Sequence, residues 1–200
     1  MKRLALVILL PILMLYGCFR LTFPTYSWHQ KLTLVVETPD GVRSGASVTR
    51  HIVRKQPTFG LADVGSISHS LRGEATVVDL GDGRYLFALL NGRKGLERAA
   101  FADRIPADQR LHFAVKQLDG AAPVPLPDAP LLVTFGDLSD PASVKRVDPA
   151  DLAATFGAGY ALREITLEVT DEPVTEGVVE GVFDYFTWPK EKRKDYREPL

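Results

Sequence analysis

Cysteine is almost absent from this chain. Among 200 residues there is one, Cys18, so the chain can form no intramolecular disulfide and no cluster of thiolate ligands for zinc. An excess of either charge is also lacking, because 24 basic and 25 acidic residues give a formal net charge of −1. This balance argues against the strongly basic surface of a dedicated nucleic-acid-binding protein, and we expect no nucleic-acid partner.

The short motifs of common enzymes are missing as well. The sequence has no nucleophile elbow, no phosphate-binding loop, no H-E-x-x-H zinc motif and no EF-hand spacing. Its histidines, His29, His51, His69 and His112, are scattered, and no two have the spacing that aims both at one metal from a strand or helix. We therefore expect no cofactor and no metal site, and we assign no catalytic residue.

Two aspartates near a glycine turn, Asp79 and Asp82, are candidates for acid–base or cation chemistry. Aspartate is favoured in turns because its side chain accepts hydrogen bonds from nearby backbone N–H groups, which explains both residues without a ligand. The alternative is an envelope hydrolase with a site assembled from distant residues, namely His51, His69, His112, Asp79 and Asp82. Convergence of two of these histidines and one aspartate in a pocket would favour that alternative.

One long hydrophobic run is present, and it lies at the N-terminus. Lys2 and Arg3 precede an apolar stretch, residues 4–19, which Arg20 ends. This arrangement is typical of a signal peptide. A helix that crosses a bilayer needs about 20 apolar residues, so this run is short for a full span. Because no small-x-small cleavage site follows it, release of a free secreted protein is the weaker interpretation.

The run ends in Leu15-Tyr16-Gly17-Cys18, which resembles the lipobox of bacterial lipoproteins. In that motif an aliphatic residue, a small residue, Gly or Ala and then Cys direct lipid attachment to the cysteine, so the resemblance implies that Cys18 is lipidated. Tyr16 departs from the pattern, which prefers a small side chain there. An uncleaved hydrophobic anchor is the alternative. Since the basic N-terminal flank stays in the cytoplasm, both outcomes predict a membrane-anchored protein on the periplasmic side of the envelope.

The composition divides the chain into four parts. Residues 1–20 form the signal peptide or membrane anchor, and residues 21–30 form a tether. Residues 31–187 are predicted to be a single β-rich extracytoplasmic domain, since burial of a core becomes efficient near ~150 residues. Residues 188–200 form a charged C-terminal tail.

Alternation of apolar and polar residues predicts several strands. The clearest case lies within residues 163–173, where Ile165, Leu167 and Val169 face inward. Residues 111–118 alternate in the same way and predict another strand, and residues 131–135 predict a short one. Two further β-rich runs are joined by the turn Gly81-Asp82-Gly83, which suits a tight hairpin. The second run, residues 85–90, is apolar throughout and predicts a central strand.

Helix signals are fewer. Asp148 as N-cap, Pro149 at the first helical position and Gly157 at the end predict a short helix, and residues 96–102 predict one or two turns. Residues 119–130 contain four prolines and predict a surface connection without regular structure. Residues 178–186 are expected to be a last β or aromatic segment. Together these patterns predict a mainly β fold, an antiparallel β-sandwich or open barrel with one or two short helices.

Three stretches resemble a group of uncharacterised proteobacterial envelope proteins. They are the Ser-Gly-Ala-Ser-Val stretch at residues 44–48, the VDLGDG hairpin, and the segment VDPADLAATFG followed by ITLEVTDEPVT. The resemblance covers most of residues 28–177. It implies a location in the envelope but supplies no catalytic residues. We therefore expect a membrane-tethered periplasmic protein that binds an envelope protein or polymer, or serves as a structural component, without catalysis.

Overall fold

The computed structural model describes residues 9, 13, 14, 17, 24–55, 67–90 and 95–182. Lys2, Arg3, Tyr16 and Cys18 lie outside the described residues, as does the predicted charged tail. Within the described part of the chain, no helix combines the length and the apolar character needed to cross a membrane.

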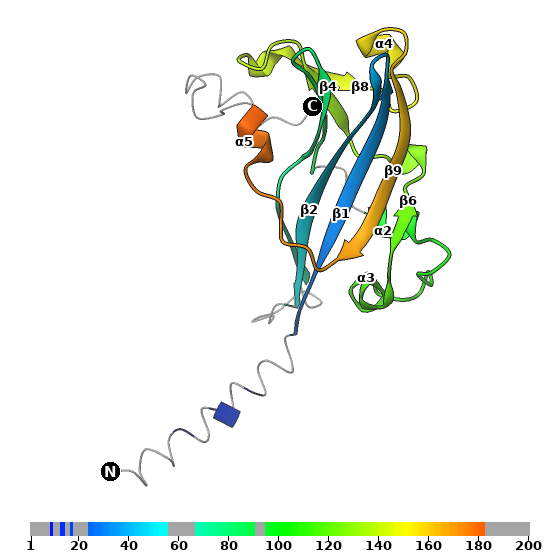
Figure 1. The fold of residues 1–200 in the computed structure, drawn as a ribbon. Helices are drawn as coiled ribbons and strands as arrows, with labels where there is room; N and C mark the ends of the chain where they lie inside the picture. The colour runs from blue at the N-terminus through cyan, green and yellow to red at the C-terminus, as the bar shows by residue number, and fades with distance from the viewer. Residues whose placement is uncertain are drawn as a thin grey trace. The chain divides into compact units, whose positions relative to one another are not determined.

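The fold is mainly β and consists of two antiparallel sheets (Figure 1), which confirms the predicted class. The first sheet has the strand order β3-β2-β1-β9-β6, and the second has the order β4-β5-β7-β8. The strands of the first sheet are β1 (Thr25–Thr38), β2 (Gly41–Lys55), β3 (Ile67–Arg72), β6 (Ala121–Pro123) and β9 (Ala161–Thr170). Those of the second are β4 (Thr76–Gly81), β5 (Arg84–Ala88), β7 (Leu132–Phe135) and β8 (Val144–Val147). Strand β1 thus includes the second half of segment 21–30.

Short helical segments connect the strands. The α-helices are α2 (Leu96–Ala100), α3 (Leu111–Ala114), α4 (Ala153–Phe156) and α5 (Val178–Val182). The 3-10 turns are η1 (Val115–Gln117), η2 (Leu126–Asp128) and η3 (Pro141–Ser143).

The chain groups into two compact units. The smaller unit comprises Met1–Ser27 and His51–Leu71, and the larger comprises Trp28–Arg50 and Arg72–Leu200. The larger unit contains most of β1, the first ten residues of β2 and all of the second sheet. The pocket and contacts described below all lie in this larger unit.

The core of the larger unit is built by the inward faces of its strands. Every second residue of β1 from Trp28 to Thr38 is buried, which is the period of a strand with one covered face. Strand β9 adds Ile165 and Leu167, as the alternation predicts. The fully buried large side chains of both sheets and of the connecting segments include Phe87, Phe101, Leu32, Leu34, Leu80, Leu86, Leu132 and Leu167.

A β-bulge interrupts β9 near its start. Val36 pairs with Leu162 whereas Val35 pairs with Glu164, so Arg163 is the extra residue. A bulge shifts the alternation of side chains by one residue. As a result two successive residues, Arg163 and Glu164, are exposed, whereas Ile165 is buried and Leu162 is half-buried.

Strands β2 and β4 approach each other closely at Gly45. A Cβ atom at this position would lie 1.8 Å from the backbone oxygen of Val77, so only glycine fits without a shift of backbone. Next to it, the buried hydroxyls of Ser47 and Thr76 are 2.6 Å apart. The contact joins the two sheets along one side of the larger unit.

The predicted hairpin at Gly81-Asp82-Gly83 is confirmed. Strands β4 and β5 pair on either side of it, and Asp82 has a φ of 54°, a left-handed conformation that Asp tolerates better than most residues. Strand β5 lies between β4 and β7, so its predicted central position is confirmed as well.

The predicted strand over residues 111–118 is wrong, because these residues form α3 and η1. Ala114, Val115 and Leu118 are buried, and with Leu111 they have the spacing i, i+3, i+4, i+7 of one helix face. Phe113, which the strand would turn inward, is 46% exposed. In an eight-residue segment both periods can be found, and here burial follows the helical one.

Residues 119–130 are more regular than predicted, since they contain β6. Pro123 is compatible with this strand because β6 lies at the edge of its sheet, where one side of the backbone needs no partner strand. Residues 178–182 form α5 rather than a β segment. The rest of the predicted segment 178–186 lies outside the described residues.

The predicted helix after Asp148 is present but starts later. Asp148 Oδ1 accepts a hydrogen bond from the backbone N–H of Ala150 at 2.9 Å, which closes a turn. The α-helix begins at Ala153, and Asp151 Oδ1 accepts from the N–H of Ala154 at 3.0 Å. Gly157 follows the helix with a φ of 101°, so the predicted end is confirmed.

Candidate functional site

The side chains of Asp79 and Asp82 contact residues of their own hairpin turn and its flanks. Asp79 Oδ1 accepts a hydrogen bond from the N–H of Gly81 at 2.8 Å. Asp82 Oδ2 pairs with the Arg84 guanidinium at 3.0 Å, and its side chain is 81% exposed. These contacts are the backbone and neighbour contacts expected of turn aspartates.

The histidines of the hydrolase hypothesis lie on separate elements. His51 is on β2 and His69 on β3, both in the smaller unit, whereas His112 is on α3 with its ring 4.4 Å from that of Phe113. None of the hypothesis's five residues lines the pocket described next. Across the described residues, no three His, Cys, Asp or Glu side chains form a group that could hold a metal. No observation here favours the hydrolase alternative.

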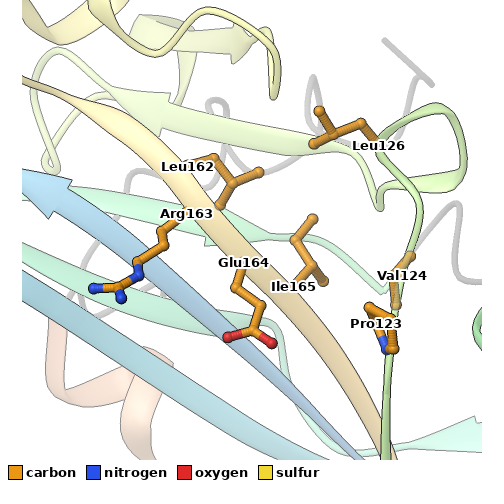
Figure 2. A pocket seen from close by; sticks show the side chains of 7 residues that line it. All are labelled: Pro123, Val124, Leu126, Leu162, Arg163, Glu164 and Ile165. Carbon is orange, nitrogen blue, oxygen red and sulfur yellow. The ribbon is translucent and has the colours of Figure 1, made fainter.

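A pocket of about 170 Å³ lies where β6 separates from β9 (Figure 2). Ala121–Pro123 pair with residues 166–168 of β9, and the N–H of Val124 donates to the oxygen of Ile165 at 2.8 Å. The chain then leaves the sheet and enters η2, which opens the space between the two segments. We call it the edge pocket, and its lining residues are Pro123, Val124, Leu126, Leu162, Arg163, Glu164 and Ile165.

The side chains that face the edge pocket are mostly apolar. In Figure 2 the Leu162 and Ile165 side chains lie on the side of β9 that faces Leu126, whereas the Arg163 and Glu164 side chains point away. The bulge produces this separation, since it places both charged residues on one face. With its charged groups turned outward, the pocket offers apolar contact rather than acid–base chemistry. Its volume is below the roughly 300 Å³ of small-molecule sites and suits a single side chain.

A buried carboxyl group lies elsewhere in the core, at Glu97 of α2. Glu97 is only 2% exposed. Burial raises the pKa of the Glu97 carboxyl, while its own backbone N–H and the nearby Trp28 indole act in the opposite direction. The protonated form is therefore favoured relative to an exposed glutamate.

Two more polar side chains are buried on neighbouring strands, Gln30 on β1 and Thr49 on β2. Both residues are 0% exposed. Among the described residues, the Gln30 amide and the Thr49 hydroxyl have no hydrogen-bond partner. Gln30 is not expected in the core from the sequence, because residues 21–30 are predicted to form a tether. The signal was present, since Trp28 and Gln30 extend the alternation of β1 by two inward positions.

The chain after β9 crosses the outer side of the first sheet. We call residues 171–177 the C-terminal strap, and in Figure 1 this orange segment runs from the end of β9 past β1 and β2 to α5. Lys31 Nζ donates to Glu172 Oε1 at 2.8 Å, and His29 Nδ1 donates to the backbone oxygen of Glu172 at 2.7 Å. The hydrogen bond and charge of Glu172, with the charge of Glu168, raise the pKa of the Lys31 ammonium against partial burial.

Beyond Glu172 the strap pairs with β2. The N–H of Val48 donates to Thr175 Oγ1 at 2.8 Å, and the N–H of Thr175 donates to the oxygen of Val48 at 3.0 Å. The strap then ends at α5, where Glu74 Oε1 and Oε2 accept from the N–H groups of Val178 and Val179 at 2.9 and 3.0 Å. Polar contacts therefore hold the strap at three points.

Comparison with protein-family models, with curated proteins and with solved structures finds no match to this chain. The resemblance to proteobacterial envelope proteins therefore stays a prediction from sequence.

Proposed function

We propose that this chain is a membrane-tethered protein of the periplasmic side of the envelope, whose β-sandwich binds a partner protein and performs no catalysis. The observation that carries the proposal is the edge pocket, which is mostly apolar, open to solvent and of side-chain size. A pocket of this kind anchors one buried apolar side chain of a partner, which is how protein interfaces concentrate their binding energy.

The position of the pocket favours an extended partner segment. In the described part of the chain, no strand is paired with the outer edge of β9 before Ile165. A partner segment could add its backbone along this edge and insert one side chain into the pocket, which is the usual mode of strand addition. Leu126, 48% exposed, would become covered.

The tether is supported by the sequence. Two basic residues, an apolar run and Cys18 form the order of a lipoprotein signal, and the resemblance to envelope proteins agrees with this location. Tyr16 is the single departure from the lipobox, so it offers a direct test of the mechanism of attachment.

The test compares the wild type with Cys18→Ala by membrane fractionation and intact-mass analysis of cells labelled with a fatty acid. We expect the wild type to fractionate with membranes and to carry a diacylglyceryl mass, and Cys18→Ala to lose both. Tyr16→Ala should increase the processed fraction, because it restores a small residue. Membrane retention of Cys18→Ala would establish the uncleaved anchor instead, and recovery of the wild type as a soluble cytoplasmic protein would refute the tether.

A further inference from the structure

We propose that the C-terminal strap occupies a second strand-addition site, on β2 at Val48, and that an extended acidic segment of a partner protein can replace it there. This proposal does not depend on the edge pocket or on the membrane tether.

The strap uses the hydrogen bonds of a strand partner. In a strand, the N–H and C=O of one residue point to the same side, so the two bonds of Val48 to Thr175 fill one position along one side of β2, a strand that lies between β3 and β1 in the sheet. Thr175 donates one of these bonds with its backbone N–H and accepts the other with its side-chain hydroxyl. A segment with a regular strand backbone could therefore make the same contacts at Val48.

The strap also covers an apolar residue. Ser47 is buried and its hydroxyl meets Thr76 of the second sheet, so Ser47 faces inward and the next residue, Val48, faces outward. Val48 is nevertheless only 3% exposed. The strap lies on this outward side, because its Glu172 contacts His29 and Lys31, which alternate with the buried residues of β1. Displacement of the strap would expose Val48 together with its backbone groups.

The strap itself is weakly embedded. Of its seven residues only Val174 and Thr175 are partly buried, and the other five are exposed. The Lys31–Glu172 pair joins side chains that are 29% and 49% exposed, and exposed ion pairs contribute little to stability. Segments with few buried apolar contacts open locally at low free energy.

The contacts define the chemistry of the replacing segment. Lys31 binds the carboxylate of Glu172, and the backbone N–H of Val48 binds the hydroxyl of Thr175, which lies three residues after Glu172 in the strap. His29 adds a donor to the backbone oxygen of the acidic residue. We therefore infer a partner segment that is extended and has an Asp or Glu three positions before a Thr or Ser, so that its charge complements Lys31.

The experiment removes two contacts that hold the strap on β2 and adds the strap sequence as a separate peptide. The double variant Glu172→Gln with Thr175→Val removes the carboxylate and the hydroxyl, and Glu176→Gln is the matched control because Glu176 is an exposed strap residue. The probe is a blocked synthetic peptide of residues 170–177, TDEPVTEG, and the control peptide is TDQPVVEG. The measurement is amide hydrogen exchange by NMR, with the core amides of Leu32 and Leu167 as internal references.

In the double variant we expect exchange at Val48 to become at least about tenfold faster, while Leu32 and Leu167 keep their rates. The peptide TDEPVTEG should restore protection at Val48 at millimolar concentration, and TDQPVVEG should not. Unchanged exchange at Val48, equal acceleration of the core amides, or restoration by both peptides would overturn the proposal. Protection restored by dimer formation without peptide would overturn it in favour of strap exchange between two copies.

Discussion

The two lateral sides of the first sheet, one at β9 and β6 and the other at β2 and β3, differ in how they are covered. On the β9 side, the three-residue strand β6 leaves a mostly apolar pocket uncovered, whereas on the β2 side a polar strap covers Val48 and its backbone groups. Unpaired strand edges are sites of pairing with other chains, and proteins protect them with short strands, charges or covering segments. Under our two proposals, the β9 side can bind a partner directly, whereas the β2 side must first release its strap.

The β2 side depends on its inner contact with β4, and breaking that contact should have the largest effect. Gly45→Ala places a Cβ against the backbone of Val77, which cannot move as a flexible side chain would. We expect a loss of about 3 kcal/mol in the free energy of unfolding, measured by urea denaturation.

Gly136→Ala is the matched control for this substitution. The nearest atoms to its added Cβ, in Ser143, are at 3.8 Å, which is ordinary contact. We expect a change within about 0.5 kcal/mol. Equal effects of the two substitutions would contradict the close approach of β2 and β4.

The far end of the strap offers the next prediction. Glu74→Ala removes the carboxylate that accepts from Val178 and Val179, and loss of a helix cap costs about 1 kcal/mol. Amide exchange at residues 178–179 should accelerate, with little change in β9. Glu180→Ala, in the same helix, serves as the control, and an identical exchange pattern in both variants would argue against the cap.

Glu97 is a buried polar residue of the core, in contrast to the mostly exposed polar residues of the strap, and Glu97→Gln tests its effect on stability. Because the folded pKa of Glu97 is raised above its unfolded value of 4.5, folding favours the proton, and stability from this group falls as pH rises above about 4.5. We expect the variant to be more stable than the wild type at pH 8, by about 1 kcal/mol, with the difference shrinking toward pH 4.5. Urea unfolding at several pH values measures this, with exposed Glu37→Gln as control; a pH-independent difference would contradict it.

The open pocket should matter least for stability. Leu126 is half-exposed, so Leu126→Ser should lower the free energy of unfolding by less than about 1 kcal/mol. Thermal or urea unfolding would check this. A much larger loss would mean that Leu126 belongs to the core, and the edge pocket would then be part of the packing rather than a binding surface.

The sequence predicted the elements whose local signals agree with their surroundings. The alternation of β9 and the glycine turn after β4 have one interpretation each, so their strands were predicted correctly. Residues 111–118 allow two interpretations, strand and helix, since alternation and helical spacing coexist in this short segment. The choice between them depends on tertiary packing. The four prolines of residues 119–130 predict no regular structure, but the edge position of β6 tolerates Pro123.

The candidate sites could be predicted far less well. The edge pocket depends on the bulge at Arg163, which only the pairing of β9 with β1 reveals. The strap depends on contacts such as Glu172 with Lys31, which are 141 residues apart in the chain. Glu97 looks like any helical glutamate until its burial is known. In each case the decisive information is a long-range contact rather than a local pattern.

The most direct test of the account is site-specific photo-crosslinking in intact envelopes. A photoreactive amino acid at position 126 samples the edge pocket, and one at position 82, an exposed turn in the same unit, is the control. We predict a protein adduct from position 126 that disappears when Leu162→Asp places a charge in the pocket, and no such adduct from position 82. Absence of the adduct at position 126, its persistence with Leu162→Asp, or an equal yield at position 82 would contradict a binding role for this edge of the sheet.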